Sequence, residues 1–275
     1  MSPPDRSKGE LHRSAQREGS SLSATSAPVL AVHHLSKAFG GVHAVRDVSF
    51  NVESGELVAL IGPNGAGKTT CFNLINGQQA PDHGEVRLGA QRIEGLPPAA
   101  IARKGVGRTF QVAATFASMT VQENVELALI AHAGDDDAFV DRGAAPRRDA
   151  ASTVLERVGV AGLADAHCAT LTYGDAKRVE LALALAAAPR LLLMDEPTAG
   201  MAIAARADLM RLAATLSHRD GLAVLFTEHD MDMVFGFADR VIVLDRGAII
   251  ASGSPAAIRA DPQVQAVYLG YDEPA

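Results

Sequence analysis

The sequence predicts an α/β protein built on a mainly parallel β-sheet. Four short apolar runs have the length and composition of fully buried strands. Segments with helical patterning separate them, and strands that alternate with helices are typical of parallel sheets. The first run leads directly into a glycine-rich turn, after which we expect a helix. The four runs are residues 56–61, 191–194, 222–227 and 241–244.

Length and composition exclude several classes of protein. The chain has 275 residues, which fits one large domain or two modest ones with ample material for a buried core. Its two cysteines are too few for a disulfide framework or a thiolate metal site. A net charge of -7 argues against broad electrostatic attraction to nucleic acid. We therefore expect no nucleic-acid partner.

The two ends and the hydropathy of the chain indicate a cytoplasmic protein. No apolar stretch reaches the roughly 18 residues that a membrane span needs, since even the best candidate contains Glu180 and Arg190. The polar N-terminus lacks the apolar core of a secretory signal. Residues 1–28, rich in Ser, Pro, Arg and Glu, are expected to form a disordered tail, and residues 271–275 a short C-terminal tail.

The folded part begins with a predicted hairpin. Residues 29–38 and 42–50 have strand character, and they flank Gly40-Gly41, a pair typical of two-residue hairpin turns. Three further elements are expected before residue 105: a helix after the glycine-rich turn that ends near Asn76 with Gly77 as its cap, an edge strand at 85–88 and a short helix at 101–104.

A long helical stretch is expected between the first two buried strands. Thr120 and Glu123 form a capping-box pattern that predicts the start of a helix ending near residue 132. The segment 134–148 is acidic and then basic, and we interpret it as a solvated surface loop. This stretch predicts an inserted helical subdomain over about 112–170. The later helical patterns cover residues 150–158 and 175–188.

The glycine-rich turn matches the phosphate-binding pattern G-x-x-x-x-G-K-[ST] in its required place between a strand and a helix. Its glycines let successive backbone N–H groups face phosphates, and the helix N-terminus adds a favourable dipole. Lys68 supplies mobile positive charge, Thr69 can offer its hydroxyl to Mg²⁺, and Thr70 can donate to a phosphate oxygen. The predicted nucleotide-binding residues are Gly62, Pro63, Asn64, Gly65, Ala66, Gly67, Lys68, Thr69 and Thr70.

Two acidic residues, Asp195 and Glu196, follow the second buried run. Neighbouring residues on a strand point to opposite faces, so these two carboxylates cannot duplicate each other's role. We expect Asp195 to hold Mg²⁺ through water and Glu196 to polarise the attacking water as a general base. Such a pair alone also occurs at ordinary strand ends, and the phosphate-binding turn favours the catalytic interpretation.

With three further segments, these residues resemble the ATP-binding cassette family over about residues 29–270. Gln111, in GRTFQ, stands at the family's Q-loop position, and residues 171–175 (LTYGD) stand at its signature position. His229, in FTEHD, resembles the switch histidine, and Phe39 resembles the aromatic residue that precedes the P-loop. The resemblance implies a RecA-like P-loop NTPase core with an N-terminal antiparallel β subdomain and an inserted α-helical subdomain.

The resemblance also implies roles for these residues, with ATP and Mg²⁺ as ligands. Phe39 would stack on adenine, although hairpin packing is an alternative for this ring. Gln111 would contact Mg²⁺ and the attacking water, and His229 the γ-phosphate. Two cassettes of the family pair head to tail, so the signature of a second, identical or different subunit completes each ATP site. The residues expected to contact ATP in trans are Leu171, Thr172, Tyr173, Gly174 and Asp175.

Two departures from the family pattern affect that pairing. The usual signature is LSGGQ, whereas this chain has LTYGD. Thr172 keeps a hydroxyl and Gly174 keeps close backbone approach, but Asp175 brings an acid towards the partner's nucleotide. Ala202 stands where many cassettes have Asp, which removes a polar contact across the dimer.

Finer resemblance is to the ATPases of branched-chain amino-acid importers, in the segments MTVQENV, FTEHDMDMVF, VIVLDRG and DPQVQAVYLG. It implies an ATP-hydrolysing importer subunit, peripheral on the inner face of the cell membrane. Its partners would be two integral membrane permease subunits and, indirectly, a solute-binding protein. The expected docking surface is a groove beside Gln111 and the helical insertion, including residues 112–119.

The alternative function is that of a soluble cassette protein that remodels nucleic acid or ribosomes. The single cassette and the acidic net charge disfavour it.

Overall fold

The computed structural model describes residues 27–109, 115–133 and 144–269. The expected tail at 271–275 and nearly all of that at 1–28 lie outside these ranges. Within them, no helix combines the length and the apolar character needed to cross a membrane. The elements are β1 (Leu30–Phe39), β2 (Val42–Val52), β3 (Leu57–Ile61), α1 (Lys68–Ile75), β4 (His83–Leu88), β5 (Gln91–Arg92), α2 (Pro98–Arg103), β6 (Val106–Thr109), α3 (Val121–Ala133), α5 (Ala144–Arg157), the 3₁₀ helices η1 (Ala161–Leu163) and η2 (Cys168–Thr170), α6 (Tyr173–Ala186), β7 (Leu191–Asp195), α7 (Ile203–Asp220), β8 (Ala223–Thr227), α8 (Met231–Phe237), β9 (Arg240–Asp245), β10 (Ala248–Gly253), α9 (Pro255–Ala260) and α10 (Pro262–Leu269).

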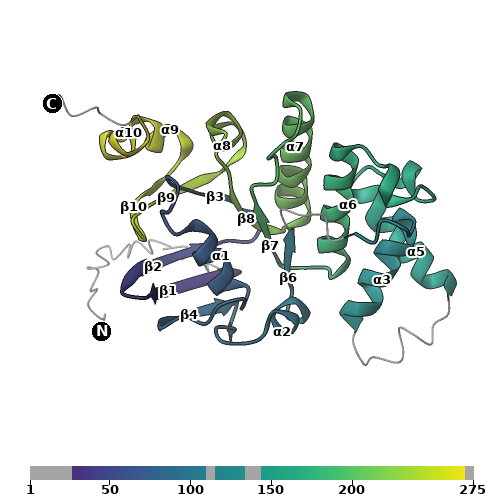
Figure 1. The fold of residues 1–275 in the computed structure, drawn as a ribbon, viewed down its shortest axis with the longest axis horizontal. Coiled ribbons are helices and arrows are strands. Elements are labelled where there is room, and N and C mark those ends of the chain that lie inside the picture. Colours follow the sequence, from purple (N-terminus) through teal and green to yellow (C-terminus); the bar gives the residue numbers. More distant parts are fainter. Residues whose placement is uncertain (1–26, 110–114, 134–143, 270–275) are drawn as a thin grey trace, which may run out of the picture.

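The larger sheet has the strand order β10-β9-β3-β8-β7-β6 (Figure 1). The five strands from β9 to β6 run parallel, and β10 joins the edge antiparallel to β9. The prediction of a mainly parallel α/β sheet is confirmed, and all four buried runs form strands of this sheet. The two outermost strands of this sheet, β6 and β10, are not predicted from the sequence, because neither is a continuous apolar run.

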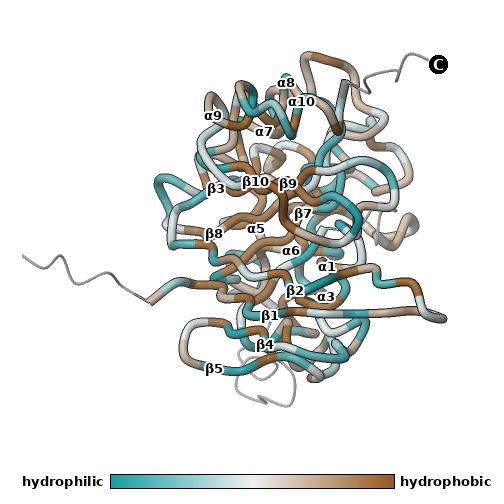
Figure 2. Tube along the Cα trace, turned by 90° about the vertical axis from the view of Figure 1, so that its left-hand side faces the viewer, coloured by the Kyte–Doolittle hydropathy of each residue, from teal (hydrophilic) through white to brown (hydrophobic). Residues whose placement is uncertain are grey.

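Both faces of the parallel sheet are buried, against different partners. One set of alternate strand residues packs with α6, α7 and α8, and the other set packs with α1 and the smaller sheet. Figure 2 shows the resulting hydrophobic centre, with β3, β7, β8 and β9 in brown. This two-sided burial explains why these strands are almost purely apolar in sequence.

The smaller sheet is antiparallel, with the strand order β2-β1-β4-β5. The expected hairpin is confirmed, and both turn residues have positive φ, 53° at Gly40 and 86° at Gly41. Two consecutive positive φ values suit a turn whose twist matches that of the strands, and glycine adopts them at little cost. The expectation of an edge strand at 85–88 is wrong in one respect, because β4 lies between β1 and the short β5.

The helices α3, α5 and α6 pack on one another away from the small sheet (Figure 1). The capping box is confirmed: the Thr120 amide donates to Glu123 Oε2 at 2.7 Å, and the Glu123 amide donates to Thr120 Oγ1 at 3.2 Å. The expected loop at 134–148 is wrong at its end, because α5 begins at Ala144, while residues 134–143 lie outside the described ranges.

Candidate functional site

The glycine-rich turn joins β3 to α1, as the sequence predicts. Gly67 caps α1 in the left-handed conformation with φ 105°, and a Cβ there would lie 2.2 Å from the Ala44 carbonyl oxygen. A Cβ on Gly62 would lie 2.3 Å from the carbonyl oxygen of Leu244. Neither position accepts a side chain without moving backbone, so the loop needs glycine for its shape.

Lys68 lies at the start of α1 and is only 8% exposed. Its Nζ donates to the carbonyl oxygens of Gly62 at 2.7 Å and Pro63 at 3.2 Å. Burial is the largest influence on the Lys68 pKa and lowers it, whereas the negative charges of Glu196 and Asp195 act to raise it. The ammonium is therefore held by its own loop, near both carboxylates.

Asp195 ends β7 and is 6% exposed. Its Oδ1 accepts from Thr227 Oγ1 at 2.8 Å, and its Oδ2 accepts from Arg108 Nη2 at 3.2 Å. Arg108 comes from the neighbouring strand β6, and no motif in the sequence identified it as a site residue. A possible signal was its place three residues before Gln111, within the segment GRTFQ, but the strand that carries it was not predicted. These two donors fix the orientation of the Asp195 carboxylate.

Glu196 follows the strand with φ 48°, in the left-handed region that costs a non-glycine residue energy. Its amide donates to Thr227 Oγ1 at 3.0 Å and to the Thr227 carbonyl at 3.2 Å. Its Oε1 lies 2.7 Å from His229 Nε2, after the adjacent strand β8. The two carboxylates thus have different partners, Arg108 and Thr227 for Asp195 and His229 for Glu196.

The oxygen donors of the site are of the kind that Mg²⁺ takes. The part of the chain that the structure describes contains no group of three or more His, Cys, Asp or Glu able to hold a metal. Asp195 offers one oriented carboxylate, and Thr69 offers an exposed hydroxyl on the first turn of α1. Mg²⁺ is commonly held by one or two carboxylates with several waters and substrate phosphates. These residues fit an ion that arrives with a nucleotide.

The signature segment forms the start of α6. Thr172 is the N-cap, and its Oγ1 accepts from the Asp175 amide at 3.2 Å while it donates to Asp175 Oδ2 at 2.7 Å. Tyr173 is 51% exposed, and its hydroxyl donates to the Ala199 carbonyl at 3.0 Å. The Thr172 hydroxyl hydrogen is therefore engaged by Asp175 within the same chain.

Two other predicted site residues lie apart from this cluster or outside the described ranges. Phe39 is 46% exposed at the end of β1, next to the hairpin turn, with Lys37 Nζ 5.5 Å from its ring centre. An exposed aromatic ring is available for stacking. Gln111 lies outside the described residues, as do 112–114 of the expected docking segment.

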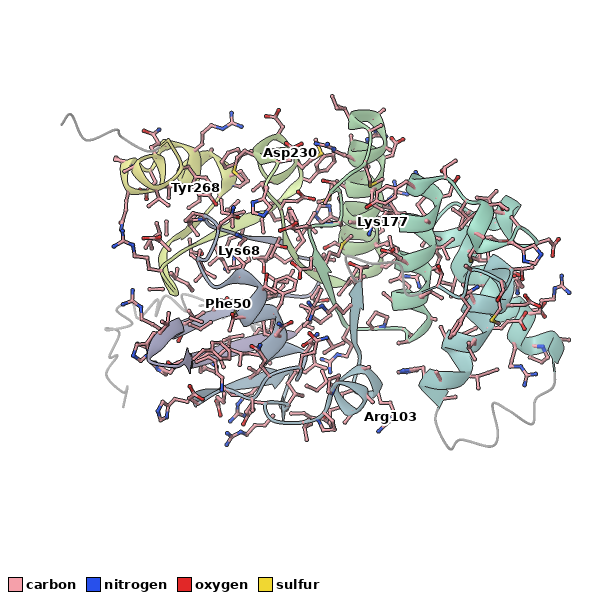
Figure 3. The ribbon with its side chains drawn as sticks, viewed as in Figure 1. Phe50, Lys68, Arg103, Lys177, Asp230 and Tyr268 are labelled. Carbon is pink, nitrogen blue, oxygen red and sulfur yellow. The ribbon has the colours of Figure 1, made fainter. Side chains whose placement is uncertain are left out.

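A cleft of about 650 Å³ lies among α2, β6, α3 and α6, and most of its lining is apolar. Phe116, from the expected docking segment, is 56% exposed at this cleft, and Leu127 of α3 is 36% exposed. Glu180 is its buried acidic group, paired with Lys177 at 3.0 Å, and burial raises the Glu180 pKa. Figure 3 labels Lys177 on α6.

Comparison with known families gives two matches. The sequence model of the ABC transporter family matches residues 45–199. That of the branched-chain amino acid ATP-binding cassette transporter matches residues 248–274.

Individual ATP-binding proteins of known sequence or structure are also similar to this chain. The chain is 41% identical over 253 residues to the high-affinity branched-chain amino acid transport ATP-binding protein LivG of Salmonella typhimurium, covering 89% of this chain and 99% of that protein. The ADP conformation of MJ1267, an ATP-binding cassette of an ABC transporter, matches with a TM-score of 0.80 and 30% identity over 88% of this chain and 99% of that one. A dimeric structure of the cassette MJ0796 bound to ADP and Pi matches with a TM-score of 0.69 and 28% identity, over 82% of this chain and 98% of that one.

Proposed function

Because the chain belongs to the ABC transporter family, in which it is an ATP-binding and ATP-hydrolysing subunit, we propose that it powers the import of branched-chain or related amino acids. The observation that supports the ATPase site best is the convergence of Lys68, Asp195, Glu196 and His229 at the carboxyl ends of β3, β7 and β8. Support for the solute comes from LivG and from the match of residues 248–274.

In the proposed mechanism, each site residue contacts a different part of the bound nucleotide, the attacking water or the metal ion. The loop from Gly62 to Thr70 binds the phosphates through backbone N–H groups, and Lys68 adds positive charge. Glu196 polarises the attacking water, while His229, already 2.7 Å from Glu196, contacts the γ-phosphate and keeps that carboxylate oriented. Asp195 (through water), Thr69 and Gln111 would hold Mg²⁺, and the bound ion would neutralise phosphate charge. Phe39 stacks on adenine.

We place two copies of the cassette, identical or different, head to tail around two ATP molecules. The structure of the similar cassette MJ0796 is dimeric and bound to ADP and Pi, which supports the pairing of two cassettes. In this chain, Leu171, Thr172, Tyr173, Gly174 and Asp175 would face the partner's nucleotide. The Thr172–Asp175 hydrogen bond then opposes closure, because the hydroxyl must leave a carboxylate before it can donate to a phosphate.

Replacement of Asp175 by Gln is expected to tighten ATP-dependent dimerisation by about threefold or more, since it removes a negative charge that would face phosphates. Sedimentation velocity with ATP, in a Glu196→Gln background that prevents turnover, measures the association. Asp165→Asn removes a charge from a 90% exposed side chain and serves as the control. Unchanged or weaker association of the Asp175→Gln protein would contradict this role.

The apolar cleft beside α3 is the proposed docking surface for two membrane permease subunits. An apolar concave surface of this kind suits an amphipathic helix of a partner. Docking there would hold the cassette on the inner face of the cell membrane, with a solute-binding protein as an indirect partner.

Replacement of Leu127 by Asp is expected to prevent co-purification with the permease subunits and to leave the ATPase activity of the isolated chain within about twofold of the native value. A charge in an apolar contact loses its water without gaining a partner. Leu127→Met preserves the shape and should co-purify normally. Retention of both permeases by the Asp variant would place the docking surface elsewhere.

The experiment that tests the importer function is purification of the tagged chain from native membranes. Recovery of two apolar permeases, followed by identification of the ligand of the associated binding protein, would establish import and its solute. Recovery of ribosomes or DNA without permeases would favour the soluble remodelling alternative.

A further inference from the structure

The parallel pairing of β7 with β8 ends just before the two residues proposed to act on the attacking water and the γ-phosphate. The last paired residues are Asp195 and Thr227. Glu196 then leaves the extended conformation with φ 48°, and His229 lies two residues beyond the end of β8. Their side chains nevertheless meet at 2.7 Å, from Glu196 Oε1 to His229 Nε2. Contacts between the two turns must therefore set how these side chains face each other.

Glu228 connects the two turns and is only 4% exposed. Its Oε1 accepts from the Thr198 amide at 2.9 Å and from Thr198 Oγ1 at 2.6 Å. Its Oε2 accepts from the His229 amide at 3.1 Å. Both oxygens thus act as acceptors, which is the role of an ionised carboxylate, and hydrogen bonds to a charged acceptor are the strong ones. These three donors offset the cost of burying the charge.

Thr198 belongs to the turn that begins at the proposed base. It is 1% exposed, and the Ala199 amide next to it donates to the Glu196 carbonyl at 3.1 Å. A contact at Thr198 therefore restrains the backbone of Glu196 through the same turn. On the other side, the contact with the His229 amide restrains the backbone that carries the imidazole. Glu228 thus acts on both members of the pair through their main chains.

We propose that Glu228 is a positioning residue for ATP hydrolysis: its buried carboxylate holds the turn after β7 against the turn after β8 and thereby sets the distance between Glu196 and His229. The inference rests on the proposed roles of those two residues. The three groups that donate to Glu228 all lie outside residues 62–70. Loss of the carboxylate should therefore slow turnover and leave the binding of ATP intact.

Glu228→Gln in the full chain is the first test. The amide has one acceptor oxygen, so its NH₂ group must face either the Thr198 donors or the His229 amide. We expect the kcat for ATP hydrolysis to fall about fivefold to thirtyfold, a loss typical of a buried polar group left unsatisfied. The KM for ATP and the dissociation constant of a fluorescent ATP analogue should stay within about twofold. A native kcat, or a matching loss of ATP affinity, would contradict the proposal.

Substitutions of Thr198 test the same contact from the other side and keep the carboxylate. Thr198→Val removes the hydroxyl and keeps the branched shape, and it should lower kcat about threefold to tenfold. Thr198→Ser keeps the hydroxyl and should hydrolyse ATP within about twofold of the native rate. In the double variant Glu228→Gln/Thr198→Val the two losses should not multiply, because both remove one contact. Equal losses in the Val and Ser variants, or fully multiplicative losses in the double variant, would overturn the inference.

Two controls separate positioning from general stability and from the proposed site. Val264→Ala removes packing by a side chain that is 5% exposed on α10, so it should lower the melting temperature and leave kcat unchanged. An equal fall of kcat in this control would show that lost stability alone explains the Glu228→Gln result. Normal hydrolysis by Glu196→Gln would instead show that the proposed base is wrong. An inactive Glu196→Gln protein beside a native kcat in Glu228→Gln would refute the positioning role alone.

Discussion

Replacement of Glu196 by Gln is expected to lower the ATPase kcat by about a hundredfold or more while ATP still binds. The amide cannot accept a proton from water, and general-base assistance is typically worth about 10² to 10⁴ in rate. The Gln side chain keeps the size and the hydrogen-bonding reach of Glu, so its contact with His229 can persist. An assay of phosphate release would measure turnover. The fluorescence of a nucleotide would measure its binding, so the two effects are separated.

The same variant should accumulate as a nucleotide-bound dimer, visible by size-exclusion chromatography with ATP. Glu156→Gln makes the same chemical change at an exposed position on α5 and should behave as the native chain. Normal hydrolysis by the Glu196→Gln protein would refute the general-base assignment.

Replacement of Lys68 by Ala is expected to weaken ATP binding by about tenfold or more. The ammonium is the positive charge of the loop, and a charge-assisted hydrogen bond to a phosphate typically contributes about 1.5 to 3 kcal/mol. Removal of the side chain also deprives the Gly62 and Pro63 carbonyls of their donor. Isothermal titration with ATP measures the loss of affinity. Comparison with the Glu196→Gln variant then separates the role of Lys68 in binding from that of Glu196 in turnover.

Lys104→Ala is the matched control, because Lys104 is an exposed lysine that follows α2. It should bind ATP with native affinity. If Lys68→Ala bound as tightly as this control, the charge that holds the phosphates would have to come from elsewhere.

The fold could be predicted from local signals where those signals were strong. Apolar runs bounded by turns identified β3, β7, β8 and β9, and the pair Gly40-Gly41 identified the hairpin. The strand β6 gave no such signal, because Gly107 and Arg108 interrupt its apolar character. It is a strand because its backbone pairs with β7, a tertiary effect that a short sequence window does not contain.

The candidate site was predictable as a set of residues and only partly as a geometry. Motif spacing indicated Lys68, Asp195, Glu196 and His229, and the structure brings them together through parallel strands. The pairing of Arg108 with Asp195 depends on packing between distant segments. The roles of Lys68 and Glu196 are predictions that the variants above test.

The left-handed backbone of Glu196 has a consequence for any selection on heat resistance. A non-glycine residue at φ 48° costs about 1 kcal/mol or more, which glycine would recover. Variants enriched for thermal endurance alone would therefore tend to lose the residue proposed as the base. The native chain keeps an unfavourable backbone conformation at this position. Folding stability therefore favours glycine here, whereas ATP hydrolysis requires the glutamate.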